Sequence, residues 1–167
     1  RCYADAEQPV QVGSALYWSP DSQMIAFHED ALRMLYDADI WLLDIAGERF
    51  LNVTDDDVSG SFMRMDRVPG VDILPTWDPA SGDLYFFRYA RTLLGDANAI
   101  YRVRADDIAA DAEPEPVANL TQAFPVPFPV YDIAISTLDG SADIAPDGSA
   151  MAFVARPATG QPEQFAI

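Results

Sequence analysis

One ten-residue pattern occurs three times in this chain of 167 residues. In each copy a large apolar residue lies two positions before a proline, and a phenylalanine lies seven positions after that proline. The copies align without a gap, and their defining residues are Trp18, Pro20 and Phe27; Trp77, Pro79 and Phe86; and Ile144, Pro146 and Phe153. Such self-similarity indicates a repeat architecture, which constrains the fold more than any single motif does.

Each copy predicts a strand, a tight turn and a second strand. Pro20-Asp21-Ser22 suits a type I turn, because proline presets φ and the aspartate bonds its own backbone. Pro146-Asp147-Gly148 has the same form. In the second copy the glycine, Gly82, comes one residue later. We therefore expect the second turn to differ from the other two.

Two further elements repeat behind this pattern. Residues 39–44 are matched by 99–104 and 163–167, and residues 49–54 are matched by 116–121. Each unit therefore contains four short strands with turn residues between them. The unit that starts at Pro79 is longer than the first, and seven of its extra residues fall in an acidic insertion at 105–116. We expect that insertion to be a loop.

Four-stranded units in tandem predict an all-β fold, a β-propeller of antiparallel blades. A β-sandwich is the main rival, but it requires no repeated turn-plus-strand pattern. About three blades' worth of strands is present, so the prediction is a partial propeller, part of a longer polypeptide whose subunit mass exceeds 18.3 kDa. The expected parts are 1–14, the last two strands of a preceding blade; 15–73 and 74–140, two full blades; and 141–167, the first three strands of a further blade.

These motifs resemble the TolB-type propeller repeats, in which a Trp-Ser-Pro-Asp-Gly turn precedes an Ile-Ala-Phe strand. The first unit matches through Trp18-Ser-Pro-Asp, Ile25-Ala-Phe, Ile40-Trp41 and Val53-Thr54, whereas the third unit departs with Ile144 in place of Trp. The resemblance implies a non-catalytic protein-binding or structural subunit, a peripheral component of a bacterial envelope complex on the periplasmic or extracellular face. The alternative is the gating propeller of a prolyl-oligopeptidase-like serine peptidase, whose catalytic domain lies outside this chain.

Composition excludes several function classes. The net charge is −17, with 27 acidic residues against 10 basic ones, and this balance argues against binding nucleic acid. No apolar run approaches the ~20 residues that span a bilayer. His28 is the sole histidine, and no Gly-x-Ser-x-Gly pentapeptide occurs, so we expect no catalysis by this chain. Cys2 is the sole cysteine, which excludes an intrachain disulfide.

A metal site is a weaker hypothesis. Asp55, Asp56 and Asp57 form a carboxylate run, with Asp66 and Asp72 downstream, and carboxylates are the ligands that Ca²⁺ prefers. The spacing lacks the Asp-x-Asp-x-Asp-Gly loop of known cation sites, so we expect a solvated turn. We expect no cofactor and no small-molecule substrate.

Protein partners are the expected ligands, and loops are the expected contact sites. Residues 61–67 combine apolar and basic side chains, the types enriched at interfaces, and Met63, Arg64 and Arg67 are the candidates there. Residues 124–130 alternate with proline, which favours an extended segment with Phe124 and Phe128. That segment is either a stiff connector or a docking segment. The loops 28–38 and 88–98 are expected to pack on their own blade.

Overall fold

Three antiparallel sheets make up the described part of the chain. The computed structural model describes residues 12–29, 38–55, 70–92, 95–110, 113–120, 142–155 and 164–166. The first sheet contains β1 (Tyr17–Trp18), β2 (Met24–His28), β3 (Ile40–Asp44) and β4 (Arg49–Asn52). The second contains β5 (Gly70–Trp77), β6 (Leu84–Thr92), β7 (Gly95–Val103) and β8 (Glu115–Asn119). The third contains β9 (Ala142–Ile144), β10 (Met151–Ala155) and β11 (Gln164–Ala166).

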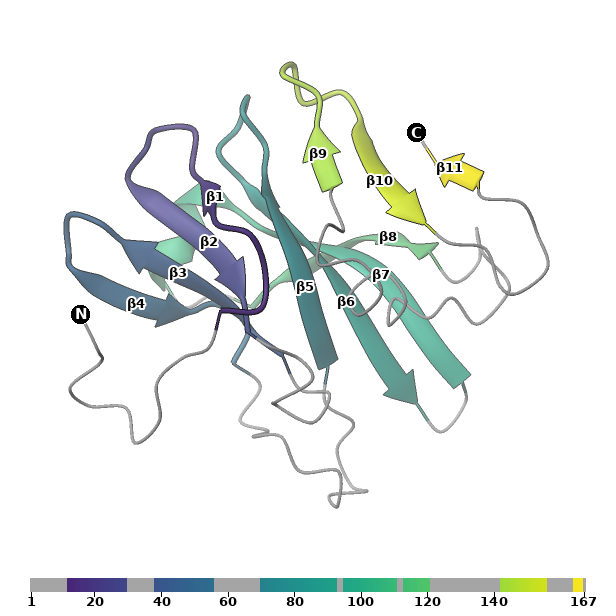
Figure 1. Cartoon of the computed structure of the whole chain (residues 1–167). Coiled ribbons are helices and arrows are strands. Elements are labelled where there is room, and N and C mark those ends of the chain that lie inside the picture. Colours follow the sequence, from purple (N-terminus) through teal and green to yellow (C-terminus); the bar gives the residue numbers. More distant parts are fainter. Residues whose placement is uncertain are drawn as a thin grey trace.

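The sheets stand side by side in chain order, and each is a simple meander (Figure 1). β5 contacts β1 and β2 on one side and β9 on the other, so the second sheet lies between its two neighbours. The strands predicted from the repeat are therefore confirmed, and their order within each sheet follows the sequence. One 3₁₀ helix, η1 (Ala105–Ala110), lies between β7 and β8.

The repeated turn is built by its own side chains. In the first copy the N–H of Ser22 donates to the carbonyl of Ser19 at 2.9 Å. The hydroxyl of Ser19 donates to the Asp21 carboxylate at 2.6 Å and accepts from the N–H of Met24 at 2.9 Å. The first two residues after the proline are thereby locked, and Ser22 adopts a left-handed φ of 60°.

The second turn differs from the first and third, as its glycine position predicts. Gly82 donates to the carbonyl of Asp78, four residues back, at 2.8 Å. Gly148 instead donates to Ala145, three residues back, as Ser22 does in the first turn. Gly82 and Gly148 both have positive φ, 78° and 72°. The one-residue shift of glycine therefore lengthens the turn and keeps the left-handed residue at its end.

Two predicted loops are instead ordered elements. The described residues of the loop expected at 88–98 instead continue β6 and β7, which pair from Leu84↔Val103 to Thr92↔Gly95. The acidic insertion 105–116 contains η1 and the start of β8, and Ile108 of η1 is buried. The acidic composition of the insertion did not predict η1, because one buried apolar side chain is enough to hold a short helix on the core.

The predicted boundaries of the units need one correction. β5 begins at Gly70, so a boundary between residues 73 and 74 falls inside a strand. The strand continues through a β-bulge between Ile73 and Thr76, where Leu74 has a φ of 55° and the buried Pro75 needs no N–H partner. At the other end, Val12 bridges Glu29 beside β2, and the remainder of 1–14 lies outside the described residues.

The hydrophobic core lies in the two junctions between sheets. Between the first and second sheets lie Ala26, Ile40, Leu42, Trp77, Leu84, Phe86, Val103 and Ile108. Between the second and third lie Ile73, Leu74, Phe87, Ile100 and Ala142, with Phe153 packed edge-on against Phe87 at 5.2 Å, and Ala38, just before β3 of the first sheet, joins the same cluster. The second sheet is thus buried on both faces, which explains why its strands do not alternate between apolar and polar residues.

Exchange of the residues at the left-handed position tests this account of the turn. Ser22→Gly is expected to raise the free energy of unfolding by about 0.5–1 kcal/mol, because glycine adopts this φ without strain. The matched change Gly148→Ser is expected to lower it, since a Cβ there would lie 3.1 Å from the Asp78 carboxylate. Urea unfolding measures both; destabilisation by Ser22→Gly contradicts the account.

Candidate functional site

The structure describes only part of the predicted site. Met63, Arg64, Arg67, Phe124 and Phe128 lie outside the described residues, as do Asp56, Asp57 and Asp66. Asp55 is exposed at the end of the first sheet. Within the described ranges, no group of three or more His, Cys, Asp or Glu residues is arranged to hold a metal ion.

His28 is a strand-end residue in this fold. It is buried, its Nδ1 lies 2.8 Å from the carbonyl of Glu29, and its backbone N–H donates to the hydroxyl of Ser14 at 3.0 Å. These contacts hold the end of β2 against residues 12–14, which extend beside it. These contacts give His28 a structural role at the end of β2 in the first sheet.

An ion pair lies inside the junction of the first two sheets. Asp72 on β5 faces its cross-strand partner Arg88 on β6, and the guanidinium donates from Nε at 2.7 Å and from a terminal nitrogen at 2.6 Å. The side chain of Asp72 is 2% exposed. The guanidinium carbon also lies 4.6 Å from the ring centre of Tyr101 and 5.6 Å from that of Phe86, so the cation is close to two aromatic rings.

The contacts of Thr54 in the same junction explain why the repeat ends with a threonine. The hydroxyl of Thr54 accepts from the N–H of Ile40 at 2.9 Å and donates to the Asp39 carboxylate at 3.3 Å. The N–H of Asp72 donates to the carbonyl of Ala38 at 2.7 Å, which ties β5 to the start of the third strand of the first sheet. We call Asp39, Thr54, Asp72 and Arg88 the junction cluster.

Burial decides the electrostatics of this cluster. Loss of water raises the pKa of Asp72 to about 6, although the hydrogen bond and charge of Arg88 and the hydrogen bond of Thr54 oppose the rise. The negative charge of Asp39 adds to it. Asp72 is therefore ionised at neutral pH, where it depends on Arg88 for its stability. Sequence reasoning treated Asp72 only as a distant metal candidate; the missed signal was Arg88, which follows the apolar run Leu84-Tyr-Phe-Phe87 in the same strand.

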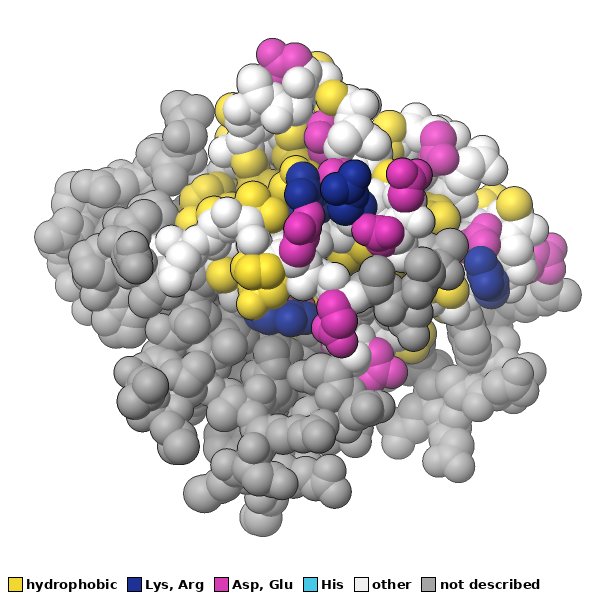
Figure 2. All heavy atoms as spheres, turned by 180° about the vertical axis from the view of Figure 1, so that it is seen from behind, with side chains coloured by type: hydrophobic (Ala, Val, Ile, Leu, Met, Phe, Trp, Pro, Cys, Tyr) yellow, Lys and Arg dark blue, Asp and Glu magenta, His cyan; other side chains and the backbone are white. Residues whose placement is uncertain are grey.

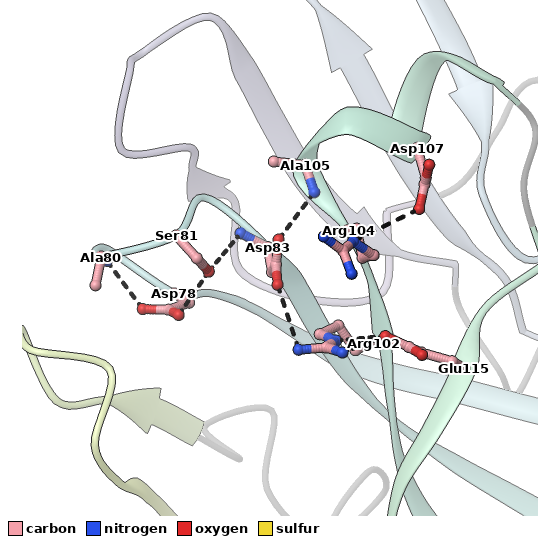
Figure 3. A network of polar contacts seen from close by, with 9 residues as sticks. All are labelled: Asp78, Ala80, Ser81, Asp83, Arg102, Arg104, Ala105, Asp107 and Glu115. Atoms are coloured by element: carbon pink, nitrogen blue, oxygen red, sulfur yellow. Dashed lines mark hydrogen bonds and ion pairs between the residues drawn. The ribbon is translucent and has the colours of Figure 1, made fainter.

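A second polar network lies where the turns emerge from the second sheet (Figure 3). The carboxylate of Asp78 accepts from the N–H of Ala80 at 2.9 Å and from the hydroxyl of Ser81 at 2.6 Å. Asp83 accepts from the N–H of Ala105 at 2.9 Å and pairs with Arg102 at 3.6 Å. This network fastens the turn to the start of η1.

The repeated turns, which connect β1 to β2, β5 to β6 and β9 to β10, lie at the same end of the three sheets (Figure 1). We call this end of the strands the turn edge. It carries Asp21, Asp78 and Asp147, one from each turn. Hydrogen bonds hold the pKa of each carboxyl below its usual value: chiefly from the Ser19 hydroxyl, the Ser81 hydroxyl and the Ser149 hydroxyl, respectively. The three side chains are therefore negatively charged and fixed in position at neutral pH.

Among the side chains that the structure describes, each basic one is paired with a carboxylate. The arginines whose side chains are described each lie within 4 Å of a carboxylate; they are Arg49, Arg88, Arg102 and Arg104. Figure 2 shows the back of the molecule, where acidic side chains surround the few basic ones. A chain of net charge −17 whose described arginines are internally paired presents a negative surface to its surroundings.

Comparison with known proteins bears on the fold. A scan against protein-family models matches none, and a search of curated proteins finds no similar sequence. The solved structure of TolB from Acinetobacter baumannii is similar, with a TM-score of 0.50 over 98% of this chain and 20% sequence identity. This chain spans 33% of that chain. Together with the sheets above, the similarity shows a partial β-propeller of four-stranded antiparallel blades.

The described part of the chain contains no helix long and apolar enough to cross a membrane.

The junction cluster predicts unequal effects from its two charged members. Arg88→Met leaves a buried carboxylate without a cation, and we expect it to lower the free energy of unfolding by about 3–5 kcal/mol at pH 7. Asp72→Asn keeps the shape and leaves Arg88 partly exposed beside Tyr101, so we expect a smaller loss. Urea unfolding of both variants checks the order, and an equal or larger loss in Asp72→Asn contradicts it.

The pH dependence of stability follows from the raised pKa. The pKa of Asp72 in the folded state, about 6, lies above the ordinary value for aspartate. The carboxyl therefore adds to the free energy of unfolding, and this stabilisation is fully present below about pH 4. It is lost as the pH rises through about 6. The free energy of unfolding of the wild type minus that of Asp72→Asn should therefore be larger at pH 5 than at pH 7. The matched variant Asp78→Asn should show no change in this difference between pH 5 and pH 7, and a decrease only as the pH falls below about 4, because the pKa of Asp78 is lowered.

Proposed function

We propose that this chain is a non-catalytic, protein-binding portion of a β-propeller that serves a peripheral component of a bacterial envelope or membrane-associated complex. The observation that carries the proposal is the turn edge: fixed carboxylates on a frame of packed sheets, with the described arginines paired internally. Such an edge is suited to a basic protein surface, because complementary charge speeds and orients association. The periplasmic or extracellular location rests on the resemblance of the repeats.

The sheets supply what a binding platform needs. The second sheet is buried on both faces, and the turn carboxylates are held by bonds to their own backbone and serines. A partner would therefore meet charges that are already in position, and association would cost little ordering of side chains. The loops that contain Met63, Arg64, Arg67, Phe124 and Phe128 remain proposed contact sites.

Charge reversal at the turn edge tests the proposal. Asp21→Lys and Asp147→Lys change exposed side chains, so the fold should persist, as circular dichroism would verify. We expect both to weaken co-purification of native partners, identified by mass spectrometry, and the wild-type complex to dissociate as salt increases. Asp55→Lys is the matched control, because Asp55 is exposed at the opposite edge of the first sheet.

Two results would contradict the proposal. Partner recovery that is unchanged in both turn-edge variants would exclude this edge as the contact. The loop residues are then tested by Met63→Ala, Arg64→Glu and Arg67→Glu, and unchanged recovery in these too excludes both surfaces. A native polypeptide that continues into an α/β-hydrolase domain would instead support the peptidase alternative.

A further inference from the structure

The sequence holds far more negative charge than its own basic side chains can neutralise. It contains 27 acidic residues against 10 basic ones, and every basic residue is an arginine. Like charges that are held together in a compact fold repel one another, and unfolding moves them apart. The net charge of −17 therefore opposes folding wherever no counter-charge lies close to the carboxylates.

The arginines that the structure describes act locally. Arg88 lies in the junction of the first two sheets, where its partner Asp72 is buried. At the surface, the described ion pairs join Arg49 to Asp44, Arg102 to Asp83 and Glu115, and Arg104 to Asp107. Each of these arginines therefore neutralises carboxylates that it contacts, and carboxylates elsewhere on the surface gain little from them.

Three exposed carboxylates take part in none of the described ion pairs. They are Asp21 in the first turn, Asp147 in the third turn and Asp106 in η1. Asp21 and Asp147 accept their described hydrogen bonds from neutral hydroxyl and backbone N–H groups. Because these bonds lower the pKa of both carboxyls, uptake of protons near neutral pH does not relieve the repulsion.

We propose that mobile cations stabilise this fold and that the chain is suited to a medium of high ionic strength. The cations gather diffusely around the acidic surface and screen its self-repulsion, so the effect involves no single cation site. The screening length falls from about 30 Å at 0.01 M salt to about 8 Å at 0.15 M. Since sheets packed face to face lie about 10 Å apart, salt in this range weakens repulsion between sheets and largely spares the close ion pairs.

This inference does not rest on the binding of a partner at the turn edge. Salt weakens a complex between surfaces of opposite charge, whereas it stabilises a fold that repels itself. The two effects have opposite signs and are measured on different samples, a complex in one case and the unbound protein in the other. The two proposals can therefore fail separately.

Urea unfolding of the native polypeptide at pH 7, between about 10 and about 200 mM NaCl, tests the proposal. Urea is uncharged, so the denaturant adds no ions of its own. We expect the equilibrium constant for unfolding to fall about tenfold or more over this range, because screening removes the repulsion. Magnesium chloride at the same ionic strength should give a similar fall, since diffuse screening depends on ionic strength.

A triple variant assigns the effect to the carboxylates outside the described ion pairs. It combines Asp21→Asn, Asp106→Asn and Asp147→Asn. Asparagine keeps the oxygen that accepts hydrogen bonds in the turns, and all three side chains are exposed, so the variant should stay folded, as circular dichroism would verify. We expect its stability to depend less on salt than that of the wild type, because the removed charges contribute repulsion alone.

The matched control removes the same number of charges from carboxylates that contact an arginine. It combines Asp44→Asn, Asp107→Asn and Glu115→Gln. These changes remove attraction as well as repulsion, so we expect the dependence of stability on salt to stay close to that of the wild type.

Three outcomes overturn the proposal. The first is an unfolding equilibrium constant of the wild type that is unchanged or rises with NaCl. The second is a fall that occurs with magnesium chloride and not with NaCl, because it would indicate a bound divalent ion. The third is an equal reduction of the salt dependence in both triple variants, since the carboxylates outside the described ion pairs would then have no special part.

Discussion

The packing of Trp77 onto the preceding sheet is the contact on which this structure depends. Trp77 lies at the end of β5 in one cluster with Ala26 and Tyr17 of the first sheet, and its indole N–H donates to the backbone carbonyl of Tyr17. Ile144, at the same repeat position at the end of β9, is also buried. Single sheets of this size cannot bury enough apolar surface to be stable alone. Side-by-side packing gives each sheet the apolar cover that its neighbours supply.

Polar groups then fix how the sheets meet. Within the second sheet, the paired hydrogen bonds between Asp72 on β5 and Arg88 on β6 hold the Asp72 side chain in one geometry. The bond from Asp72 N–H to Ala38 O joins that geometry to the neighbouring sheet. The raised pKa of Asp72 records the cost of burying a charge there, so the ion pair is more informative about orientation than about net stability.

The edges and faces of the sheets divide their roles. Hydrogen bonds from the turn serines fix the turn carboxylates, of which Asp21 and Asp147 are exposed and Asp78 is buried, so the turn edge is charged and rigid. The faces are apolar and pair with other faces of the same repeat. The charged turn edge and the apolar faces of the sheets are thus separate surfaces. That separation allows a propeller frame to vary its partner without disturbing its core.

The sequence by itself determined the strands and their order, because a turn signature and a strand length are local properties that repeat visibly. It also anticipated the altered second turn, since the position of Gly82 limits where a left-handed φ can occur. Only the tertiary structure decided that the described residues of 88–98 continue β6 and β7, that Ile108 joins the core and that Asp72 meets Arg88. Those outcomes depend on contacts between strands and on burial. The same holds for Trp18: the sequence marks it as equivalent to Trp77, but only the arrangement of the sheets shows that one is covered and the other exposed.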